Sequence, residues 1–146
     1  TVSGKTYAIL MAPDEGESPS TLQWKTSNSS TEGTTSATDG WANTLAMTET
    51  EALRLSHPAA AYCRSYDGGG FDDWYLPSRN ELALAWTYRS QLGELNLGKN
   101  TTYVWSSTQY NASNAWYRRF SDGNESYSNK GDAPRVRPVR RLELVI

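Results

Sequence analysis

Residue types that carry most covalent and metal-dependent chemistry are scarce in this chain of 146 residues, which has one histidine, His57, and one cysteine, Cys63. His57 precedes a proline and has no Cys, Asp or Glu at metal-ligand spacing, so we expect neither a metal site nor a general base there. Cys63 stands among Ala and Tyr in a helical pattern, which favours a buried, unreactive thiol over a nucleophile. We therefore expect no enzyme activity, no cofactor and no bound metal.

Two acidic pairs, at positions 14–15 and 72–73, supply the oxygen atoms that calcium prefers as ligands. Calcium-dependent lectins hold their sugar-bridging ion with Glu-Pro-Asn or Gln-Pro-Asp and with Trp-Asn-Asp. None of these triplets occurs in the sequence. A sugar-bridging calcium ion is therefore not expected.

The tail from Tyr103 onward places bulky anchors such as Trp105, Trp116 and Phe120 in a filler of Asn, Ser, Tyr, Asp and Gly. Asn, Ser and Asp are mostly exposed in folded proteins, so this filler does not form a core. Tyr combined with Ser, Gly and Asn is typical of adaptable binding surfaces. The pattern indicates recognition, and the predicted ligand-binding residues are Tyr110, Asn111, Asn114, Tyr117, Arg119, Asn124, Tyr127, Asn129 and Asp132.

Side-chain alternation over 115–120 divides a predicted strand into two faces. If Trp116 and Phe120 point inward, Tyr117 and Arg119 point outward, where a Tyr ring can stack on a ligand and a guanidinium can bind a carboxylate or sulfate. The alternative is that the polar filler is an ordinary solvated surface.

Two capping boxes, Thr48–Glu51 and Ser78–Glu81, predict the helices that support this surface. The first helix should cover 49–66, with a proline interruption, and end before the glycine run 68–70. The second should cover 79–92 and stop at the following glycine.

Strands are predicted from apolar runs and turn signals. One covers 5–12, and the long segment 13–40 is irregular except for a short strand at 22–25. The tail should contain strands at 103–108, 115–120, 125–128 and 135–144. The order of elements predicts an α+β fold with two helices packed on a small antiparallel sheet with long loops.

Length and composition narrow the class of protein. The length fits one domain, 1–146, and the start at Thr1 indicates a piece of a longer chain. Only 37% of residues are apolar, but six Trp and nine Tyr offset this because each ring buries a large area. The net charge of −2 shows no basic excess, so nucleic acid is not an expected partner. No apolar run approaches the ~20 residues that span a membrane.

Four Asn-x-Ser/Thr sequons, at Asn28, Asn100, Asn111 and Asn124, allow two interpretations. They are acceptors for N-glycosylation only in a glycosylating secretory pathway. Chance occurrence in a sequence rich in Ser, Thr and Asn is the favoured interpretation.

The segment Asp73–Leu82, with Trp74-Tyr75-Leu76-Pro77-Ser78 and Glu81, resembles the signature of the Legionella collagen-like protein C-terminal domain family. The resemblance covers 39–141 and includes Asp39-Gly40 and Asn43-Thr44. It also includes Trp105-Ser106-Ser107-Thr108, Ala115-Trp116, Phe120, Gly123, Lys130 and Val136–Val139. The chain departs from the family at Tyr75, where Arg is usual, and at Arg118 and Glu125, where Val is frequent.

The resemblance implies a C-type-lectin-like fold, distantly related to formylglycine-generating enzymes, whose pair of cysteines this chain lacks. It implies occurrence in adhesins, phage tail proteins and targets of diversity-generating retroelements, in which the polar filler reads the ligand. It also makes Trp74, Trp105 and Trp116 core anchors in preference to sugar-stacking platforms. An anion site remains the alternative for Arg135, Arg137, Arg140 and Arg141, but structural pairing with Asp72, Asp73 or Glu81 is favoured.

The first functional hypothesis is a receptor-binding domain of a phage tail fibre or bacterial adhesin. Its expected partner is a glycan or protein on a cell surface, and its expected location is the virion or the bacterial surface. A homo-oligomer, such as a trimer, is expected within a larger particle. The alternative hypothesis is a structural virion component, in which the same surface is buried against a neighbouring subunit.

Overall fold

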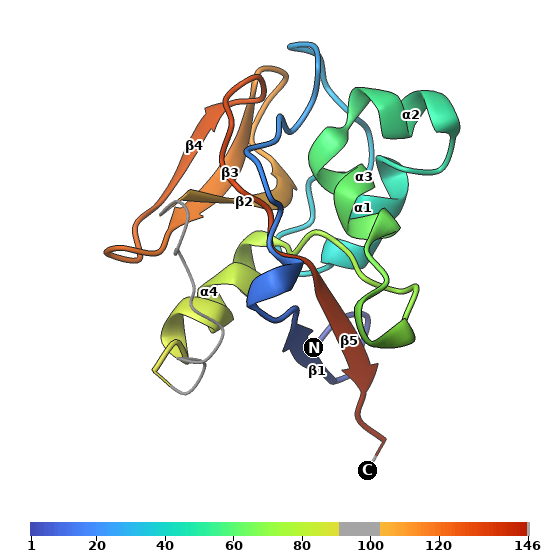
Figure 1. Ribbon diagram of the computed structural model, residues 1–146, viewed down its shortest axis with the longest axis vertical. Coiled ribbons are helices and arrows are strands. Elements are labelled where there is room, and N and C mark those ends of the chain that lie inside the picture. The colour runs from blue at the N-terminus through green and yellow to red at the C-terminus, as the bar shows by residue number, and fades with distance from the viewer. Residues whose placement is uncertain (91–102, 146) are drawn as a thin grey trace.

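A computed structural model describes residues 1–90 and 103–145, in which four α-helices accompany two small antiparallel sheets. The two-stranded sheet pairs β1 (Tyr7–Met11) with β5 (Val139–Glu143), so segments from the two ends of the chain lie side by side (Figure 1). The three-stranded sheet has the order β2 (Tyr103–Gln109), β3 (Asn114–Arg119), β4 (Glu125–Asn129). The predicted α+β class is confirmed.

Three short helices lie together on one side of the molecule, opposite the three-stranded sheet (Figure 1). They are α1 (Gly40–Ala46), α2 (Glu51–Ser56) and α3 (Pro58–Ser65). The fourth helix, α4 (Arg79–Thr87), contacts both β2 and β3. Single 3-10 turns occur at Asp14–Gly16 and Gly68–Gly70.

The prediction of two helices is wrong, because the region 40–66 is divided into three. Thr48 does not cap a helix, since its hydroxyl donates to the Thr44 carbonyl oxygen at 2.8 Å. The cap of α2 is Thr50, whose hydroxyl accepts from the Leu53 amide at 3.1 Å. The preceding helix α1, capped by the Asp39 carboxylate, was not predicted from the sequence.

The later helix signals are confirmed in part. Pro58 occupies the first turn of α3, where its missing N–H costs nothing. At α4 the capping box is complete: the Ser78 hydroxyl accepts from the Glu81 amide, and the Glu81 carboxylate accepts from the Ser78 amide at 2.9 Å. The helix ends at Thr87 and a turn follows, so the predicted end at Leu92 is too late for the described residues, and 91–92 lie outside them.

The predicted strand at 22–25 is absent, and β5 is shorter than predicted. Leu22 and Trp24 donate single backbone hydrogen bonds to the carbonyl oxygens of Pro134 and Lys130, and no ladder forms. Arg135 makes only an isolated bridge to Val104. Prolines at 134 and 138 cannot donate to a ladder, which explains why the regular strand begins at Val139.

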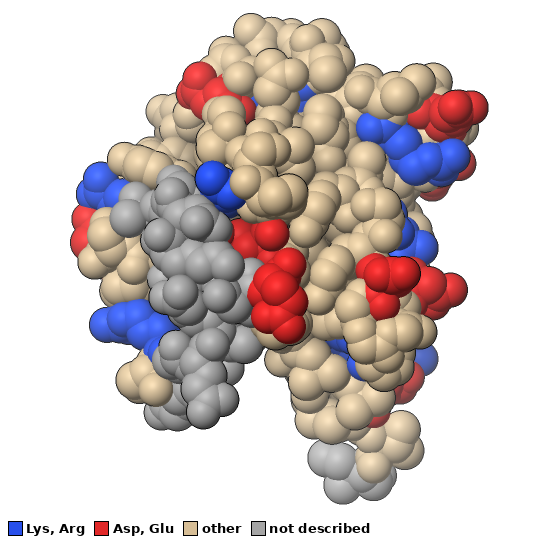
Figure 2. All heavy atoms as spheres, viewed as in Figure 1, with Lys and Arg blue, Asp and Glu red and all other residues tan. Residues whose placement is uncertain are grey.

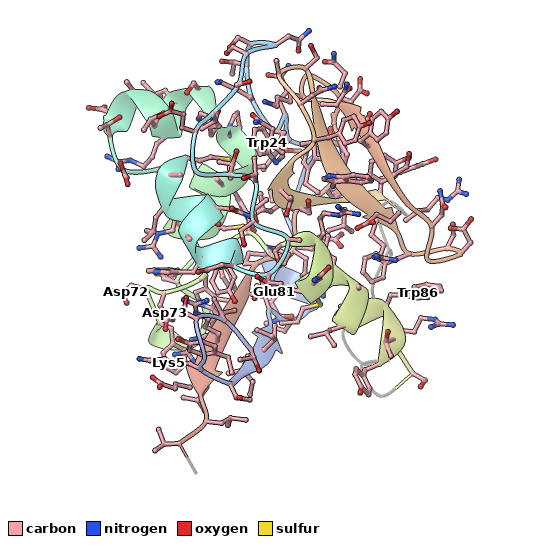
Figure 3. The ribbon with its side chains drawn as sticks, turned by 180° about the vertical axis from the view of Figure 1, so that it is seen from behind. Lys5, Trp24, Asp72, Asp73, Glu81 and Trp86 are labelled. Carbon is pink, nitrogen blue, oxygen red and sulfur yellow. The ribbon has the colours of Figure 1, made fainter. Side chains whose placement is uncertain are left out.

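The hydrophobic core lies between the helices and the three-stranded sheet and is built around two fully buried indoles, Trp24 and Trp105. Figure 3 shows Trp24 between these layers. The Trp24 N–H donates to the Ser106 carbonyl oxygen at 2.8 Å, and the Trp105 N–H donates to the Leu22 carbonyl oxygen at 2.7 Å. Because both polar tips are paired, the large rings are buried without an unsatisfied donor.

Candidate functional site

The predicted ligand-binding residues do not form one surface. Trp116 lies opposite Tyr127 in the β3–β4 register, and Tyr117 lies opposite Ser126. Because neighbouring residues of a strand point to opposite faces, Tyr127 shares a face with Trp116, whereas Tyr117 and Arg119 belong to the other face. The sheet therefore divides the predicted residues into two groups.

The predicted orientation of β3 is wrong. Ala115 is fully buried and Tyr117 packs against the core, so the supposed outward face is the one that meets the core. Trp116 is only half-buried, although Trp74 and Trp105 are buried as predicted. The other face of β3 is partly covered by α4, which carries Trp86 (Figure 3). The Trp86 ring meets Phe120 edge to face at 6.0 Å between ring centroids. Alternation identifies the two faces of a strand but does not say which element covers each one.

We call Tyr110, Trp116 and Tyr127 the aromatic platform. The Tyr110 and Tyr127 rings are stacked at 3.9 Å between centroids and 4° between planes. Both meet Trp116 edge to face, at 5.1 Å and 5.6 Å. Each tyrosine is 45% exposed, so the platform presents aromatic surface to solvent while its members fix one another.

Arg79, at the start of α4, supports the platform. Its guanidinium carbon lies 3.7 Å from the centre of the Trp116 ring. The same guanidinium donates to both Glu125 carboxylate oxygens, at 3.1 Å and 2.6 Å. The cation–π contact and the ion pair together fix the Trp116 ring in place. Sequence reasoning missed this contribution, because Arg79 lies far from the tail and looked like an ordinary helix residue.

Asparagines around the platform shape its turns. The Asn111 side-chain oxygen accepts from the amides of Ser113 and Asn114, at 3.0 Å and 2.9 Å. The Asn129 side-chain oxygen accepts from the Gly131 amide at 2.8 Å. Asn114 and Asn129 are cross-strand neighbours. These predicted binding residues therefore lie near the platform, and part of their hydrogen-bonding capacity stabilises the turns.

Lys130 is fully buried and holds the end of β2 that leads to Tyr110. Its ammonium group donates to the Gln109 side-chain oxygen at 2.6 Å and to the Ser29 carbonyl oxygen at 2.9 Å. No carboxylate is among its hydrogen-bond or ion-pair partners in the described residues, and the ammonium lies 4.7 Å from the centre of the Trp24 ring. Burial, with a smaller contribution from Lys25, lowers the pKa of Lys130 to about 8.

This pKa predicts an unusual pH dependence. Between pH 8 and the ordinary lysine value of 10.5, the folded protein releases the Lys130 proton while the unfolded chain keeps it, so stability rises with pH. The neutral amine still has two N–H groups for its two acceptors. Relative to Lys130→Met, the wild type should gain about 1–2 kcal/mol of unfolding free energy between pH 7.5 and 9.5.

Urea denaturation of both proteins across this pH range measures the effect. The difference between the two proteins removes the contribution of the groups that titrate in both and leaves that of Lys130. A difference that is constant with pH would contradict the assignment.

On the opposite face, Tyr103 and Tyr117 meet edge to face at 5.2 Å between centroids. Arg119 and Asp122 form an ion pair in which the guanidinium holds the pKa of the Asp122 carboxyl below its usual value. The Arg119 guanidinium is therefore already paired with a carboxylate within the protein. Asn124 is exposed in the β3–β4 turn, where its backbone amide donates to the Asp122 carboxylate at 3.0 Å. This turn and the β2–β3 turn that contains Asn111 lie at opposite ends of β3.

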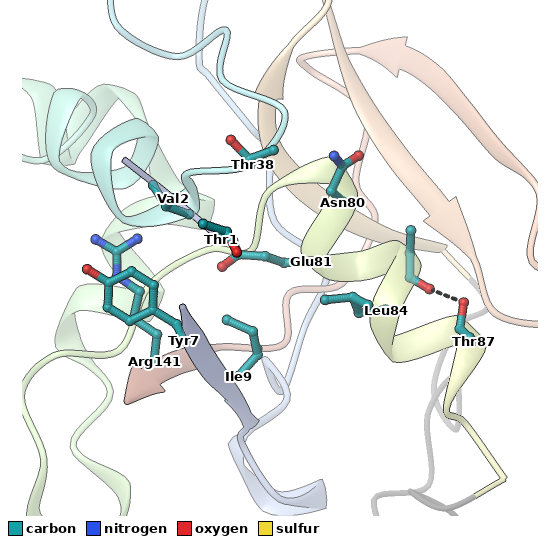
Figure 4. Close-up of a pocket in the computed structure, with 11 residues that line it drawn as sticks. Thr1, Val2, Tyr7, Ile9, Thr38, Asn80, Glu81, Leu84, Thr87 and Arg141 are labelled. Atoms are coloured by element: carbon teal, nitrogen blue, oxygen red, sulfur yellow. Dashed lines mark hydrogen bonds between the residues drawn. The ribbon is translucent and has the colours of Figure 1, made fainter. Parts of the chain in front are cut away.

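A cleft of about 380 Å³ lies between β1 and α4, with Tyr7 and Ile9 on one side and Leu84 on the other (Figure 4). Its carboxylate, Glu81, accepts from the Tyr75 hydroxyl at 2.6 Å and from two backbone amides, Gly40 at 3.2 Å and Ser78 at 2.9 Å. Burial raises the pKa of Glu81, but these three donors stabilise its charged form. The carboxylate holds α1, α4 and the preceding loop together, so its contacts indicate a structural role.

His57 and Cys63 are both buried. The two His57 ring nitrogens lie 2.8 Å from the Thr31 hydroxyl and 2.8 Å from the Leu53 carbonyl oxygen. Burial raises the pKa of the Cys63 thiol well above its usual value, which disfavours a thiolate nucleophile. Among the described residues there is no group of three or more His, Cys, Asp or Glu side chains that could hold a metal ion.

The C-terminal arginines make structural contacts. Arg140 binds both carboxylate oxygens of Asp73, at 2.7 Å and 3.1 Å, as predicted. Arg141 pairs with Asp39 at 3.0 Å in place of the predicted Asp72 or Glu81. Arg137 pairs with the buried Glu17, and Arg135 donates to the Ser18 carbonyl oxygen. These contacts join the end of the chain to three earlier segments.

Charged side chains of both signs are interspersed on the face of the molecule drawn in Figure 2, without a continuous basic stripe. In the part of the chain that the structure describes, no helix has the length and apolar character needed to cross a bilayer.

The fold and the site define a mixed α/β module whose described surface carries an aromatic platform. The model of the Lcl C-terminal domain family matches residues 17–140, so the chain belongs to this family. This confirms the resemblance to the Legionella collagen-like protein C-terminal domain that the Trp74–Leu82 segment and the tail anchors indicated. No curated protein matches the chain.

Proposed function

We propose that this domain is a non-enzymatic, metal-independent binding module with a C-type-lectin-like fold, and that its aromatic platform recognises a glycan on a cell surface. We place it on a phage tail fibre or a bacterial adhesin. Membership of a surface-associated bacterial family supports this location in part. The buried states of His57 and Cys63 support a role in binding rather than in catalysis.

The observation that carries the proposal is the exposed stack of Tyr110 and Tyr127 beside Trp116. An exposed apolar patch with a polar rim marks interaction sites. A tyrosine ring offers an apolar face to the C–H groups of a sugar, and its hydroxyl can hydrogen-bond to sugar hydroxyls.

Two further features suit the platform to a sugar ring. The neighbouring Tyr127 hydroxyl raises the pKa of Tyr110, which keeps the Tyr110 hydroxyl protonated and able to donate to a sugar oxygen. Because the two tyrosine rings stack on each other and Arg79 fixes Trp116 beside them, little side-chain entropy is lost when a ligand binds.

The test is a double variant, Tyr110→Ser with Tyr127→Ser, assayed as a fluorescently labelled domain on an array of neutral, sialylated and sulfated glycans. The wild type should bind a subset of the array, and the variant should bind it at least about tenfold more weakly, as expected for loss of a hot spot. The melting temperature should change by only a few degrees, because both rings lie at the surface.

Tyr88→Ser is the matched control, since Tyr88 is 53% exposed at the end of α4 and makes no contact with the platform. This control should bind like the wild type, and a chelator should leave the wild-type signal unchanged. Undiminished binding by the double variant would place the site elsewhere. If the wild type binds no glycan, a protein ligand or a structural virion role becomes the better explanation.

A further inference from the structure

A second pocket opens on the other face of the β2–β3–β4 sheet. It has a volume of about 370 Å³, which is within the usual range for small-molecule sites, and it is separate from the aromatic platform. Its lining residues are Tyr103, Tyr117, Ser128, Asp132, Ala133 and Pro134.

Two aromatic rings form one corner of this pocket. The rings of Tyr103 and Tyr117 are inclined at 66° to each other, with centroids 5.2 Å apart. Tyr103 is 38% exposed, and Tyr117 rests on the core, so the corner is firmly backed and open to solvent. The faces of aromatic rings carry negative electrostatic potential and attract cations within about 6 Å of the ring centre.

Among the described residues that line this pocket, Asp132 is the only charged one. The Ser128 hydroxyl donates a hydrogen bond to its carboxylate, which fixes the carboxylate relative to β4. Aromatic walls and one carboxylate together favour a positively charged guest over a neutral or anionic one.

The basic residues of the neighbourhood do not cancel this charge. The guanidinium carbon of Arg119 lies 5.8 Å from the centre of the Tyr103 ring, but its charge is balanced by the ion pair with Asp122. Arg135 directs its guanidinium to the Ser18 carbonyl oxygen, and the Lys130 ammonium binds Ser29 and Gln109. The charges of Arg119 and Asp122 cancel, so Asp132 gives the described residues of the pocket one net negative charge.

We propose that this pocket binds an alkylated ammonium group, of the kind found in choline and in methylated lysine. Such a group is large and weakly hydrated, so it can contact two rings and a carboxylate at a small desolvation cost. The pocket lies on the opposite face from the aromatic platform, so this proposal does not depend on glycan binding. The domain can then hold two chemically different ligands on one sheet.

The experiment measures binding of choline to the domain by titration in amide-detected NMR. The comparison ligand is 3,3-dimethylbutanol, which has the shape of choline without its charge. Choline should shift the amide signals of residues around Tyr117 and Asp132. It should bind at least about fivefold more tightly than the neutral compound, since two exposed cation–π contacts at about 0.5–1 kcal/mol each add about 1–2 kcal/mol.

Two variants and one control locate the site. Asp132→Asn and Tyr103→Leu should each weaken choline binding at least about threefold, given the usual strength of an exposed charge or ring contact. Asp72→Asn makes the same change of charge on an exposed loop residue outside the pocket and should bind choline like the wild type. The platform variant Tyr110→Ser/Tyr127→Ser should also bind choline normally, which separates this proposal from the proposed function.

Equal affinity for choline and the neutral compound would show an unselective apolar hollow and overturn the proposal. Choline binding that survives both Asp132→Asn and Tyr103→Leu would overturn it as well. The melting temperature of each variant is measured alongside the titrations to show that it is folded. Because both substitutions lie at the surface, we expect both variants to fold, and one folded variant is enough for the test.

Discussion

Replacing Trp105 by alanine is expected to lower the free energy of unfolding by about 3–5 kcal/mol, the usual cost of truncating a buried Trp. Trp105 is fully buried, with 0% of its surface in contact with solvent, and it belongs to the same core cluster as Trp24. Its N–H also donates to the Leu22 carbonyl oxygen at 2.7 Å, so the truncation leaves a cavity and an unpaired acceptor. Urea denaturation at neutral pH measures the loss.

Trp116→Ala is the matched control for this measurement. Sequence alone gave both tryptophans the same role as buried anchors, but Trp116 is half-buried and its ring is packed under Arg79. Its truncation should therefore cost less, about 1–2 kcal/mol, because less apolar area returns to water. If Trp116→Ala destabilises as much as Trp105→Ala, or if the latter unfolds like the wild type, the arrangement of β2 and β3 described above is incorrect.

This comparison also shows what the sequence could predict. The start of α4 at Arg79 could be predicted, because the capping box of Ser78 and Glu81 is a local interaction, complete within four residues. The strands β2, β3 and β4 follow from short-range alternation and turn signals, and their bounds differ from the predicted ones by a residue or two. Such features depend on neighbours in the chain.

The failures depend on contacts between distant segments. Thr48 and Thr50 are both followed by a glutamate within three residues, so both could be helix caps by sequence. The position of α1 decides that the Thr48 hydroxyl donates to Thr44 instead of capping a helix. The face of β3 that meets the core is decided by Trp24 and Trp105, and Arg79 covers Trp116 from a helix more than thirty residues away in sequence. Local patterns carry no information about such long-range choices.

The candidate site shows the same limit. Residue type alone identified Tyr110 and Tyr127 as surface residues, and both are exposed. The stack between them could not be predicted, because it requires the β2–β3 turn to bring Tyr110 back over β4. Arg119, by contrast, was expected to serve a ligand, but it is held by Asp122 three residues later.

Arg118 and Glu125, two of the positions at which the chain departs from the resemblance, contact each other. These residues face one another in the β3–β4 register, and the Arg118 guanidinium lies 3.5 Å from the Glu125 carboxylate. Arg79 binds the same carboxylate at 2.6 Å. At these two positions, where the resemblance implied that Val is frequent, this chain has an ion pair that also binds Arg79 of α4.

Glu125→Val is expected to lower the free energy of unfolding by about 2–3 kcal/mol, somewhat below the cost of breaking a fully buried pair. The side chain of Arg118 is only 13% exposed, so it cannot regain full hydration when its partner is removed. Arg79, with 30% of its side chain exposed, can bind water instead and contributes less to the loss.

The double variant Arg118→Val/Glu125→Val should recover at least half of that loss, because it removes the unpaired charge and introduces an apolar cross-strand pair. Urea denaturation of the wild type, the two single variants and the double variant gives the coupling energy directly. Strictly additive losses would mean that Arg118 and Glu125 act independently. A strong coupling would show that Arg118 and Glu125 stabilise the hairpin as a pair.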